Sequence, residues 1–308
     1  MKKVLCPGEA LIDFVATEGL GNLEGSNDFV KKAGGAPANA AGAMAKLGVE
    51  AYFMGAVGND PFGNFLKKTM ETYNIKTDYL EQIDCKPTTL AFVSLTEDGE
   101  RDFKFNRGAD AKLEIRTVKG LEKFDCIHFA SATAFMGEEL ENSYDLLLEY
   151  AKKNNKLITF DANYRDALFA DNQEKFITKC KEYIASSDIV KLSDEEALLI
   201  SGESNLVIAG EKLQKLSGKY MLITLGSNGT YLFHSQGMEH ITTEKVEMVD
   251  STGAGDAFIG TVVALAVEEH TLSLERMKEI VKIANKVGAI TTQSYGALES
   301  IPNLEDIR

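Results

Sequence analysis

Short apolar segments alternate regularly with helical segments through the middle of this chain, and this alternation constrains the fold most. Four apolar runs occupy residues 126–130, 157–161, 189–192 and 220–225. Segments with helical patterning accompany them, at about 138–153, 173–185, 194–202 and 208–217. Strands that alternate with helices form parallel sheets with helices packed on the faces. The sequence therefore predicts an α/β fold built on a doubly wound, mostly parallel sheet.

The remainder of the chain follows this rhythm, with two interruptions. Strands are predicted over 4–8, 11–15 and 52–57, and helices over 37–47, 62–73 and 275–293. The runs 89–95 and 102–106 alternate in polarity like a hairpin, joined by Glu97–Glu100. With the segment near 12–33, this hairpin is expected to form a separate small sheet. No internal repeat or linker divides the chain, so we expect a single domain over residues 1–308.

The composition argues against several classes of protein. A formal net charge of −14 disfavours general binding to nucleic acids or to anionic membranes. The four cysteines form no C-x-x-C pair and three lie in apolar surroundings, so free thiols are expected; they are Cys6, Cys85, Cys126 and Cys180. The N-terminal segment lacks the apolar core of a signal peptide, and no run is long enough to span a membrane. A cytoplasmic protein is therefore expected.

The segment Asp250–Phe258 carries the strongest chemical signal. Gly253 and Gly255 leave the backbone bare, and the apolar stretch 257–267 reads as a buried helix. N–H groups at the start of a helix, together with the helix dipole, form a site for an anion. Asp256 is then either a cap or dipole partner of the helix, or a base that accepts a proton from a hydroxyl. In the second case, the N–H groups would hold developing phosphoryl charge.

A second glycine loop, Gly34–Asn39, opens the Ala-rich helix predicted over 37–47. Its paired glycines would let the backbone approach a ligand closely, and Asn39 offers both a donor and an acceptor. Asp13 ends the second predicted strand. A carboxylate and an amide beside paired glycines suit a ligand with many hydroxyl groups; the alternative is a turn with an Asn cap.

Two arginines also follow predicted strands. Arg165, after the run 157–161, would either hold a phosphate or remain a solvated surface residue. Arg107 follows the strand that carries Phe103 and Phe105, whose side chains point the same way because side chains alternate along a strand. These two rings would either cover the face of a sugar or pack in the core or in an interface.

Two further turns border strands. Glu196 would join the hydration shell of Mg²⁺, or it is the partner of Ser193 in a capping box, and the two roles are compatible. The turn Thr224–Gly229 would border a nucleotide, or simply close a hairpin into residues 230–233.

Other chemistries lack their motifs. No Lys-Ser/Thr pair follows the glycines of 253–255, as a Walker loop requires, and the dinucleotide fingerprint Gly-x-Gly-x-x-Gly is absent. The four histidines are not spaced as metal ligands, and no Ser, His and Asp lie in the context of a nucleophile elbow. A hydrolase and an NAD-dependent oxidoreductase are therefore disfavoured.

In this order, the motifs resemble those of the ribokinase-like carbohydrate kinases over nearly the whole chain. The most specific stretches are Gly34–Asn39 and Asp250–Asp256, and Cys6–Phe14, Val190–Glu196 and Gly288–Thr292 look most like fructokinases. The resemblance implies a ribokinase-like α/β domain with a small β-sheet lid, from about 12–33 and 88–108, that closes over a sugar. It also implies a homodimer through the lid, because lid strands in this family often pair between subunits.

The resemblance further implies ATP-dependent phosphorylation of a sugar hydroxyl, most closely of D-fructose to fructose 6-phosphate. Asp256 would be the base, Gly253, Ala254 and Gly255 would supply the anion hole, and Arg165 would stabilise charge. The residues expected to contact the sugar or the transferring phosphoryl group are Asp13, Gly34, Gly35, Asn39, Phe105, Arg107, Asn163 and Arg165. The residues expected around ATP are Lys191, Thr224, Gly226, Gly229, Gly253, Gly255 and Asn285, the last near the adenine.

The resemblance also implies two metal ions. Mg²⁺ would use Glu196 through water, and a monovalent cation such as K⁺ would use Asp250, Thr252, Thr291, Gly296 and Ser300. The family often has Asn-x-x-Glu where this chain has Ser193, so Asp194 or Glu195 is an alternative to Glu196.

Three other functions are compatible with the same motifs. Two are kinases of the same family, acting on 2-keto-3-deoxygluconate or on a ribonucleoside. A sensor of sugar or nucleotide without catalytic activity is the alternative from a different class.

Overall fold

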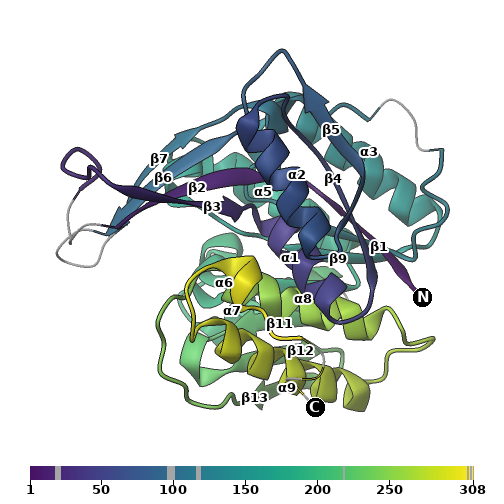
Figure 1. Ribbon diagram of the computed structural model, residues 1–308. Helices are drawn as coiled ribbons and strands as arrows, with labels where there is room; N and C mark the ends of the chain where they lie inside the picture. Colours follow the sequence, from purple (N-terminus) through teal and green to yellow (C-terminus); the bar gives the residue numbers. More distant parts are fainter. Residues whose placement is uncertain are drawn as a thin grey trace.

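The computed structural model describes residues 1–17, 22–95, 101–115, 119–217, 219–303, 305 and 307. Its strands form a large sheet in the order β13-β12-β11-β10-β9-β8-β1-β4-β5 and a small sheet in the order β3-β2-β6-β7. In Figure 1 the small sheet projects from one side of the body that is built on the large sheet.

The large sheet is parallel except at one edge. Only β12 and β13 pair antiparallel to their neighbours among the strands described. Its strands are β1 (Lys3–Pro7), β4 (Glu50–Gly58), β5 (Lys76–Ile83), β8 (Cys126–Ala130), β9 (Leu157–Asp161), β10 (Ile189–Ser193), β11 (Tyr220–Thr224), β12 (Thr230–His234) and β13 (Gly237–Ile241). Those of the small sheet are β2 (Leu11–Ala16), β3 (Phe29–Gly34), β6 (Leu90–Leu95) and β7 (Arg101–Asn106).

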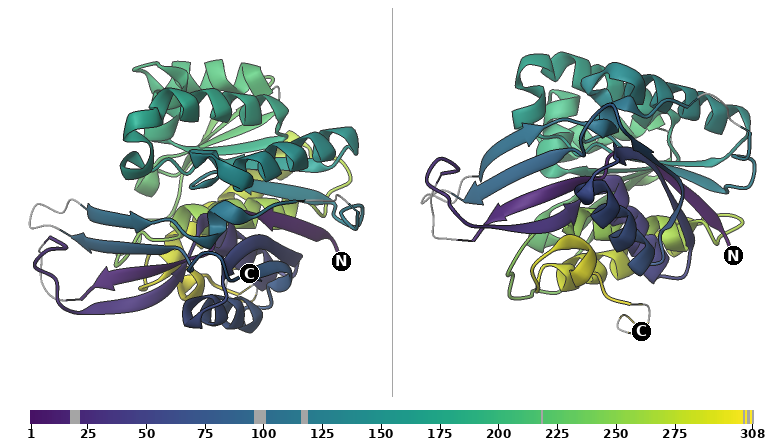
Figure 2. Two further views of the ribbon diagram at one scale, coloured as in Figure 1. Left: turned by 90° about the horizontal axis from the view of Figure 1, so that it is seen from above. Right: turned by 45° about the horizontal axis from the view of Figure 1, so that its top comes forward.

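Helices cover both faces of the large sheet, as a doubly wound fold requires (Figure 2). One face carries α1 (Ala36–Lys46), α8 (Ala254–Ala266) and α9 (Leu274–Thr291), with α2 (Pro61–Thr72) at its edge. The other face carries α3 (Glu138–Lys153), α5 (Gln173–Ser186), α6 (Asp194–Ser201) and α7 (Leu206–Ser217). Short helices are α4 (Asp166–Phe169) and α10 (Ala297–Ser300).

The strands divide their side chains between two hydrophobic cores. In β1, Val4 and Cys6 pack with α1, α8 and α9, whereas Leu5 packs with the helices of the other face. This alternation within a fully buried strand explains why the strands read as continuous apolar runs rather than as amphipathic ones. The predicted fold class, a mostly parallel sheet with a separate small sheet, is confirmed.

The predicted hairpin is also confirmed, because β6 and β7 pair antiparallel. Its predicted turn, Glu97–Glu100, lies outside the described residues. The prediction missed two edge strands, β5 and β13. The sequence of β5, KTDYLEQI, is rich in charged residues and has no buried residue, so it lacks the apolar run by which the inner strands were found.

All four cysteines are free thiols, with Cys6, Cys126 and Cys180 buried and Cys85 exposed, as expected. Within the part of the chain that the structure describes, no helix is both long and apolar enough to cross a membrane.

The N-terminal helix α1 and the C-terminal helix α8 pack against each other. Both are rich in small residues: a Cβ added at Gly260 would lie 2.6 Å from the Cβ of Ala43 and 2.7 Å from the carbonyl oxygen of Ala40. Gly260 therefore permits a close approach that any side chain would prevent. This packing brings the two glycine loops, some two hundred residues apart in sequence, to the same end of the large sheet.

Candidate active site

Asp256 lies in the first turn of α8, three residues after the left-handed glycine that caps this helix. The helix cap is Gly253, with φ 78°, and a Cβ on it would lie only 2.4 Å from the Cβ of Ala297. The loop thus requires glycine for both conformation and space. The helix that follows is buried almost throughout, as predicted, and the Asp256 side chain is itself buried, with 8% of the residue exposed.

Asn39 is the direct partner of this carboxylate. Its Nδ2 donates to Oδ2 of Asp256 over 2.9 Å. Its Oδ1 is buried and accepts no hydrogen bond from any described residue. Buried polar atoms are nearly always satisfied. The amide oxygen of Asn39 therefore marks a place where a ligand donor, such as a sugar hydroxyl, fits.

The surroundings of Asp256 adjust its basicity. Burial raises the pKa of its carboxyl above the usual value of 3.8. The hydrogen bond from Asn39 and the charges of Lys191 and Arg165 act in the opposite direction and keep that rise in check. A raised pKa makes a carboxylate a better proton acceptor near neutral pH, which suits a general base.

The backbone N–H groups of residues 253–255 directly precede Asp256 at the start of α8. The N–H of Ala254 donates to the carbonyl oxygen of Ser251 at 3.3 Å, a long bond. In the described ranges, the N–H groups of Gly253 and Gly255 donate to no protein acceptor. Two unpartnered donors lie at the positive end of a thirteen-residue helix, an arrangement in which an anion is favoured, and the anion site itself stays a prediction.

A buried ion pair lies beside this helix start. The Nζ of Lys191 is 3.0 and 3.2 Å from the two carboxylate oxygens of Asp161, and both residues are more than nine-tenths buried. A Cβ on Gly255 would lie 3.1 Å from the same Nζ. Burial lowers the pKa of Lys191, but the charges of Asp161 and Glu196 outweigh burial and raise it. Lys191 is therefore a fixed cation next to the anion site.

Glu196 forms the capping box that was one of its two predicted roles. Its carboxylate accepts from the N–H of Ser193 at 2.7 Å, and its own N–H donates to the Ser193 hydroxyl at 3.1 Å. Its second oxygen accepts from the N–H of Tyr164 at 2.8 Å. Glu196 thereby holds the loop that carries Asn163, whose φ is 49° and whose Nδ2 is buried and unpartnered among the described residues.

Arg165, next in that loop, is exposed. Its guanidinium contacts only the carbonyl oxygen of Tyr164 in the described part of the chain, at 2.9 Å. Its charge nevertheless lowers the pKa of Asp256, so the side chain lies within electrostatic reach of the carboxylate. Such a cation is available for a charged ligand.

Among the residues that the structure describes, no group of three or more His, Cys, Asp or Glu could hold a metal ion. Both oxygens of Glu196 already accept one backbone hydrogen bond each, and a carboxylate oxygen can accept a further one from water. This donor set fits Mg²⁺ carried mainly by nucleotide phosphates and water rather than in a protein cage.

The first glycine loop is shaped by two carboxylates. A Cβ on Gly34 would clash with Oδ2 of Asp13, and one on Gly35, with φ 112°, would lie 2.4 Å from the carbonyl oxygen of Glu9. The Glu9 carboxylate accepts from the N–H of Ala36 at 3.1 Å, at the start of α1. The loop thus places Asp13 at the base of the small sheet, close to the helix that carries Asn39.

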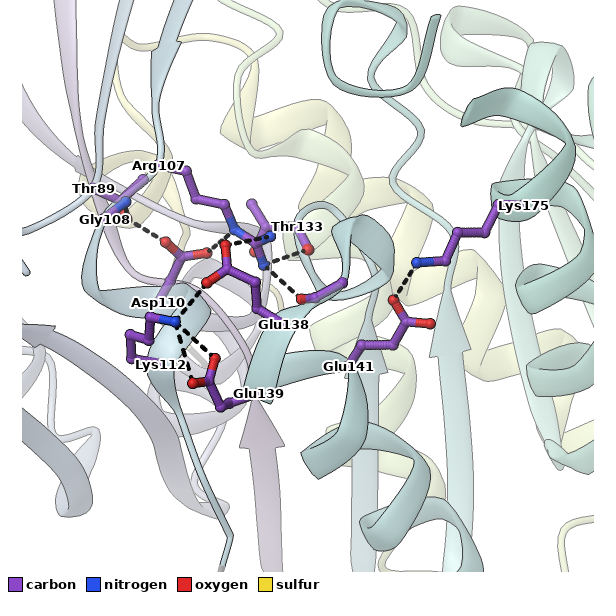
Figure 3. A network of polar contacts seen from close by, with 11 residues as sticks. Thr89, Arg107, Gly108, Asp110, Lys112, Thr133, Glu138, Glu139, Glu141 and Lys175 are labelled. Atoms are coloured by element: carbon purple, nitrogen blue, oxygen red, sulfur yellow. Dashed lines mark hydrogen bonds and ion pairs between the residues drawn. The ribbon is translucent and has the colours of Figure 1, made fainter. Parts of the chain in front are cut away.

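Arg107 links the small sheet to the body (Figure 3). Its Nε donates to Oδ2 of Asp110 at 3.3 Å, and its Nη2 donates to the carbonyl oxygen of Thr133 at 3.0 Å. Asp110 is fully buried and also accepts a short hydrogen bond from the hydroxyl of Thr89, at the start of β6. Asp110 therefore ties together the residues where β6 begins and β7 ends.

The two phenylalanines of β7 point the same way, as predicted. The rings of Phe103 and Phe105 stack with centroids 6.1 Å apart and an interplanar angle of 13°. Both are half-buried, so they leave part of their surface available to a ligand or a partner.

The turn predicted to border a nucleotide does close a hairpin. The N–H of Leu225 donates to the carbonyl oxygen of Gly229 at 2.8 Å, and β11 pairs antiparallel with β12. Gly226 and Gly229 have positive φ, and Thr224 contacts the carbonyl oxygen of Leu192. Hairpin and nucleotide border are compatible roles for a turn at the carboxyl end of β11.

The side-chain amide of Asn285 is hydrogen-bonded within the protein through both its oxygen and its nitrogen. Its Oδ1 accepts from the hydroxyl of Thr230 at 2.7 Å, and its Nδ2 donates to the carbonyl oxygen of Ile241 at 3.0 Å. A role near adenine would therefore come from its position rather than from a free side-chain amide.

The residues of the expected monovalent-cation site lie partly together. Asp250 accepts from the N–H and hydroxyl of Thr252 through Oδ1, and from the N–H of Gly296 through Oδ2. Ser300, one turn along from Gly296, has a buried Oγ without a partner in the described ranges. These oxygen donors fit a hard monovalent cation. Thr291 is buried, and its hydroxyl donates to the carbonyl oxygen of Val287.

Sequence reasoning assigned no role to Glu9, Asp110 or Asp161. Each is a fully or almost fully buried acid close to the site. Glu9 and Asp161 could have been identified from the sequence. Glu9 follows a predicted apolar strand and Asp161 ends one, and acids are unusual at such positions. Asp110 lies in a short polar turn and gave no such signal.

The chain resembles known proteins over almost its whole length. A model of the pfkB family carbohydrate kinases matches residues 1–304. A probable fructokinase-2 of Arabidopsis thaliana is 33% identical over 306 residues, which cover 96% of this chain and 91% of that protein.

Solved structures show the same similarity. A fructokinase of Xylella fastidiosa with bound ATP superposes with a TM-score of 0.88 and 26% identity, covering 99% of this chain and 96% of that one. A double mutant of a Vibrio cholerae fructokinase, bound to fructose, ADP and a potassium ion, gives a TM-score of 0.87 and 25% identity, with 100% and 97% covered. These matches extend over the small sheet as well as the site.

Proposed function

This chain belongs to the pfkB family of carbohydrate kinases and is an ATP-dependent sugar kinase, and we propose that its acceptor is D-fructose, phosphorylated to fructose 6-phosphate. The observation that carries the chemistry is the buried carboxylate of Asp256 beside free N–H groups at the start of α8. The preference for fructose is supported by the fructokinases among its relatives.

The reaction is an in-line displacement. Asp256 takes the proton of the sugar hydroxyl, and the oxygen so exposed forms a bond to the γ-phosphorus of ATP. The bond from that phosphorus to the β,γ-bridging oxygen breaks, and ADP leaves with the electron pair. The raised pKa of Asp256 supports this role, because proton transfer is most efficient from a hydroxyl to a base titrating near the working pH.

Fixed positive groups stabilise the transferring phosphoryl group. The N–H groups of Gly253 and Gly255 would donate to the charge that develops, and the helix start fixes their positions before the reaction begins. Arg165 adds an exposed cation from the loop after β9. Lys191 stays bound to Asp161 and contributes a steady potential on the ATP side.

The acceptor sugar is held from two sides. Asn39 presents a free amide oxygen, and Asp13 and the Gly34–Gly35 backbone offer acceptors and donors at the base of the small sheet. Asn163, in the loop after β9, presents a buried amide nitrogen without a partner among the described residues. Phe105 and Arg107 of the small sheet complete the set when that sheet acts as a lid and excludes water, which would otherwise compete as the acceptor.

Bound Mg²⁺ would supply charge neutralisation on the ATP phosphates, with Glu196 reaching it through water. Asp250, Thr252, Gly296 and Ser300 would hold a K⁺-type cation and so brace the loop before α8. The turn Thr224–Gly229 would border the nucleotide, and Asn285 would lie near the adenine. A homodimer through the small sheet, a cytoplasmic location and a single domain over residues 1–308 remain predictions of the sequence.

The test is a coupled assay of ADP release with Mg·ATP and a panel of acceptors. The panel contains fructose, 2-keto-3-deoxygluconate, ribose, glucose and adenosine, with a control that lacks any acceptor. We expect fructose to give the highest kcat/KM. Turnover with a different acceptor would reassign the substrate, and folded protein without any acceptor-dependent release would favour a sensor.

A further inference from the structure

We propose that Asp161 is a positioning residue of the kinase reaction: it holds the ammonium group of Lys191 away from Asp256 and so keeps that carboxylate free to accept the proton of the sugar. The inference rests on the proposed function, because it assumes that Asp256 is the base. Asp161 is the last residue of β9, and strands of a parallel sheet bring their ligand-binding groups to this end.

The register of β9 and β10 sets the two side chains beside each other. Asp161 and Lys191 are direct partners in this parallel pair of strands. Their neighbours along the chain pack in the core on the side of α3 and α5; these are Phe160, Val190 and Leu192. Because side chains alternate along a strand, Asp161 and Lys191 project from the opposite face, which α1 and α8 cover.

On that face, Lys191 reaches the start of α8. Its Nζ would lie 3.1 Å from a Cβ added at Gly255, the residue directly before Asp256. Burial raises the pKa of Asp256, and after the hydrogen bond from Asn39 the charge of Lys191 is the largest influence that opposes this rise. The ammonium group therefore contacts the residue next to the base and acts on the base itself.

A buried ammonium group needs an anionic partner, and three carboxylates compete for this one. Burial lowers the pKa of Lys191, and the charges of Asp161, Glu196 and Asp256 raise it. Both oxygens of Glu196 accept backbone hydrogen bonds. Asp161 gives both of its oxygens to the ammonium group, at 3.0 and 3.2 Å. If Asp161 lost its charge, Asp256 would be the acceptor to which Lys191 turns.

The rest of the sheet offers Lys191 no substitute for Asp161. Its register partner on the other neighbouring strand, β11, is Leu222, which is fully buried. On the same face of β10, Ile189 precedes Lys191 and Ser193 follows it. Among the described strands, Asp161 is thus the one acid in direct register with Lys191.

An ion pair between Lys191 and Asp256 would disable the base in two ways. The ammonium group would favour the ionised carboxylate, so the pKa of Asp256 would fall and its power as a proton acceptor with it. The same group would also occupy oxygens that must receive the proton. In the native pair, the carboxylate of Asp161 offsets the charge of Lys191, and Asp256 keeps the raised pKa that suits a base.

Other charged groups act on Asp256, and the test has to separate them from Asp161. They come from the loop after β9, from α6 and from the loop after β1, and they are Arg165, Glu196 and Glu9. In the described part of the chain, none of them contacts Lys191, whereas Asp161 does. Removal of Asp161 is therefore the change that releases the ammonium group.

The experiment measures the pH profile of kcat/KM for the best acceptor in wild type, in Asp161→Asn and in Asp161→Asn/Lys191→Met. Asp188→Asn is the matched control, because Asp188 also pairs with a lysine, Lys219, but at the amino end of β10. We expect Asp161→Asn to move the acidic limb to lower pH and to reduce kcat by about tenfold or more. Asp188→Asn should leave the limb in place.

The double variant identifies the cause of the shift. It contains neither the carboxylate nor the ammonium group, so the pKa of Asp256 and the acidic limb should return toward their wild-type positions. The limb decides here rather than kcat, because Lys191 also lies beside the anion site. A limb that stays at lower pH in the double variant would overturn the inference, since the ammonium group would then not be its cause.

A crystal structure of Asp161→Asn tests the contact without any turnover. We expect the Nζ of Lys191 within hydrogen-bond distance of the Asp256 carboxylate, and an ammonium group that stays at residue 161 would overturn the inference. If the two groups pair but the limb does not move, the premise that Asp256 is the base fails instead. If Asp161→Asn does not fold, Lys191→Met replaces it and should move the limb to higher pH; an unmoved limb would count against the inference.

Discussion

Asn39 donates a hydrogen bond to Asp256 across 217 positions of the sequence, at 2.9 Å and between two buried residues. This bond joins the two glycine loops that the sequence singled out separately. It is possible because Gly260 lets α8 lie directly against Ala40 and Ala43 of α1. The small residues of these helices are therefore as important to the site as the polar residues they bring together.

Replacing Asn39 by alanine should move the acidic limb of the pH–rate profile to higher pH. The hydrogen bond from Asn39 favours the ionised form of Asp256 and opposes the effect of burial on its pKa. Without it, that pKa rises further, so the base is lost to protonation earlier as the pH falls. The profile of kcat/KM for the sugar measures this, and a limb that stays in place or moves to lower pH contradicts the assignment.

A side chain at Gly255 should block the anion site. A Cβ there would already lie 3.1 Å from the Nζ of Lys191, and the branches of valine would crowd the free N–H groups. We expect Gly255→Val to reduce kcat by about a hundredfold or more, and Gly255→Ala to reduce it less. Thermal melting of both variants serves as the control for folding. Full turnover in the valine variant would remove the anion-hole role.

Glu9 should make stability depend on pH. Burial, and then the charge of Asp110, raises the pKa of its carboxyl from 4.5 to about 8. Between these values the folded protein holds a proton that the unfolded chain releases, so the free energy of unfolding falls as the pH rises through this window. Urea unfolding at about pH 5 and pH 8 should show a smaller fall for Glu9→Gln than for wild type. Equal falls would show that Glu9 titrates normally.

Asp110 should position Arg107 for the sugar. In Asp110→Asn the guanidinium loses its buried charged partner but keeps the ion pair with Glu138 at 4.0 Å and the carbonyl oxygen of Thr133. We expect the KM for the sugar to rise by about tenfold and kcat to change less, because a charged hydrogen bond is lost at a binding residue. Glu139→Gln is the matched control, since Glu139 pairs with Lys112 and not with Arg107. An unaltered KM for the sugar in Asp110→Asn would show that Asp110 does not position Arg107.

Local patterns were sufficient for most of the fold. Buried strands such as β8 to β11 are recognisable in the sequence as apolar runs. The helix α3 begins and ends where its periodicity predicts. The edge strands β5 and β13 were missed because each pairs with a single neighbouring strand and is little buried, so their sequences carry no apolar run. Strand order, and hence the meeting of α1 with α8, depends on packing between distant segments that no local pattern encodes.

The candidate site likewise contains residues that the sequence identifies and residues whose roles depend on the structure. Asp256, Asn39 and the glycines could be found because their residue types are unusual where they occur. Glu196 was ambiguous from its sequence, and the structure shows that its carboxylate makes both the capping box and the bond to Tyr164.

The most direct test of the kinase mechanism is the turnover and fructose affinity of Asp256→Asn, measured side by side with wild type. The amide keeps the size of the carboxylate and can still accept from Asn39, but it cannot take up the proton. The mechanism predicts that kcat falls by about a hundredfold or more, while fructose affinity stays within about tenfold. Turnover close to wild type in this variant would contradict the role of Asp256 as the base.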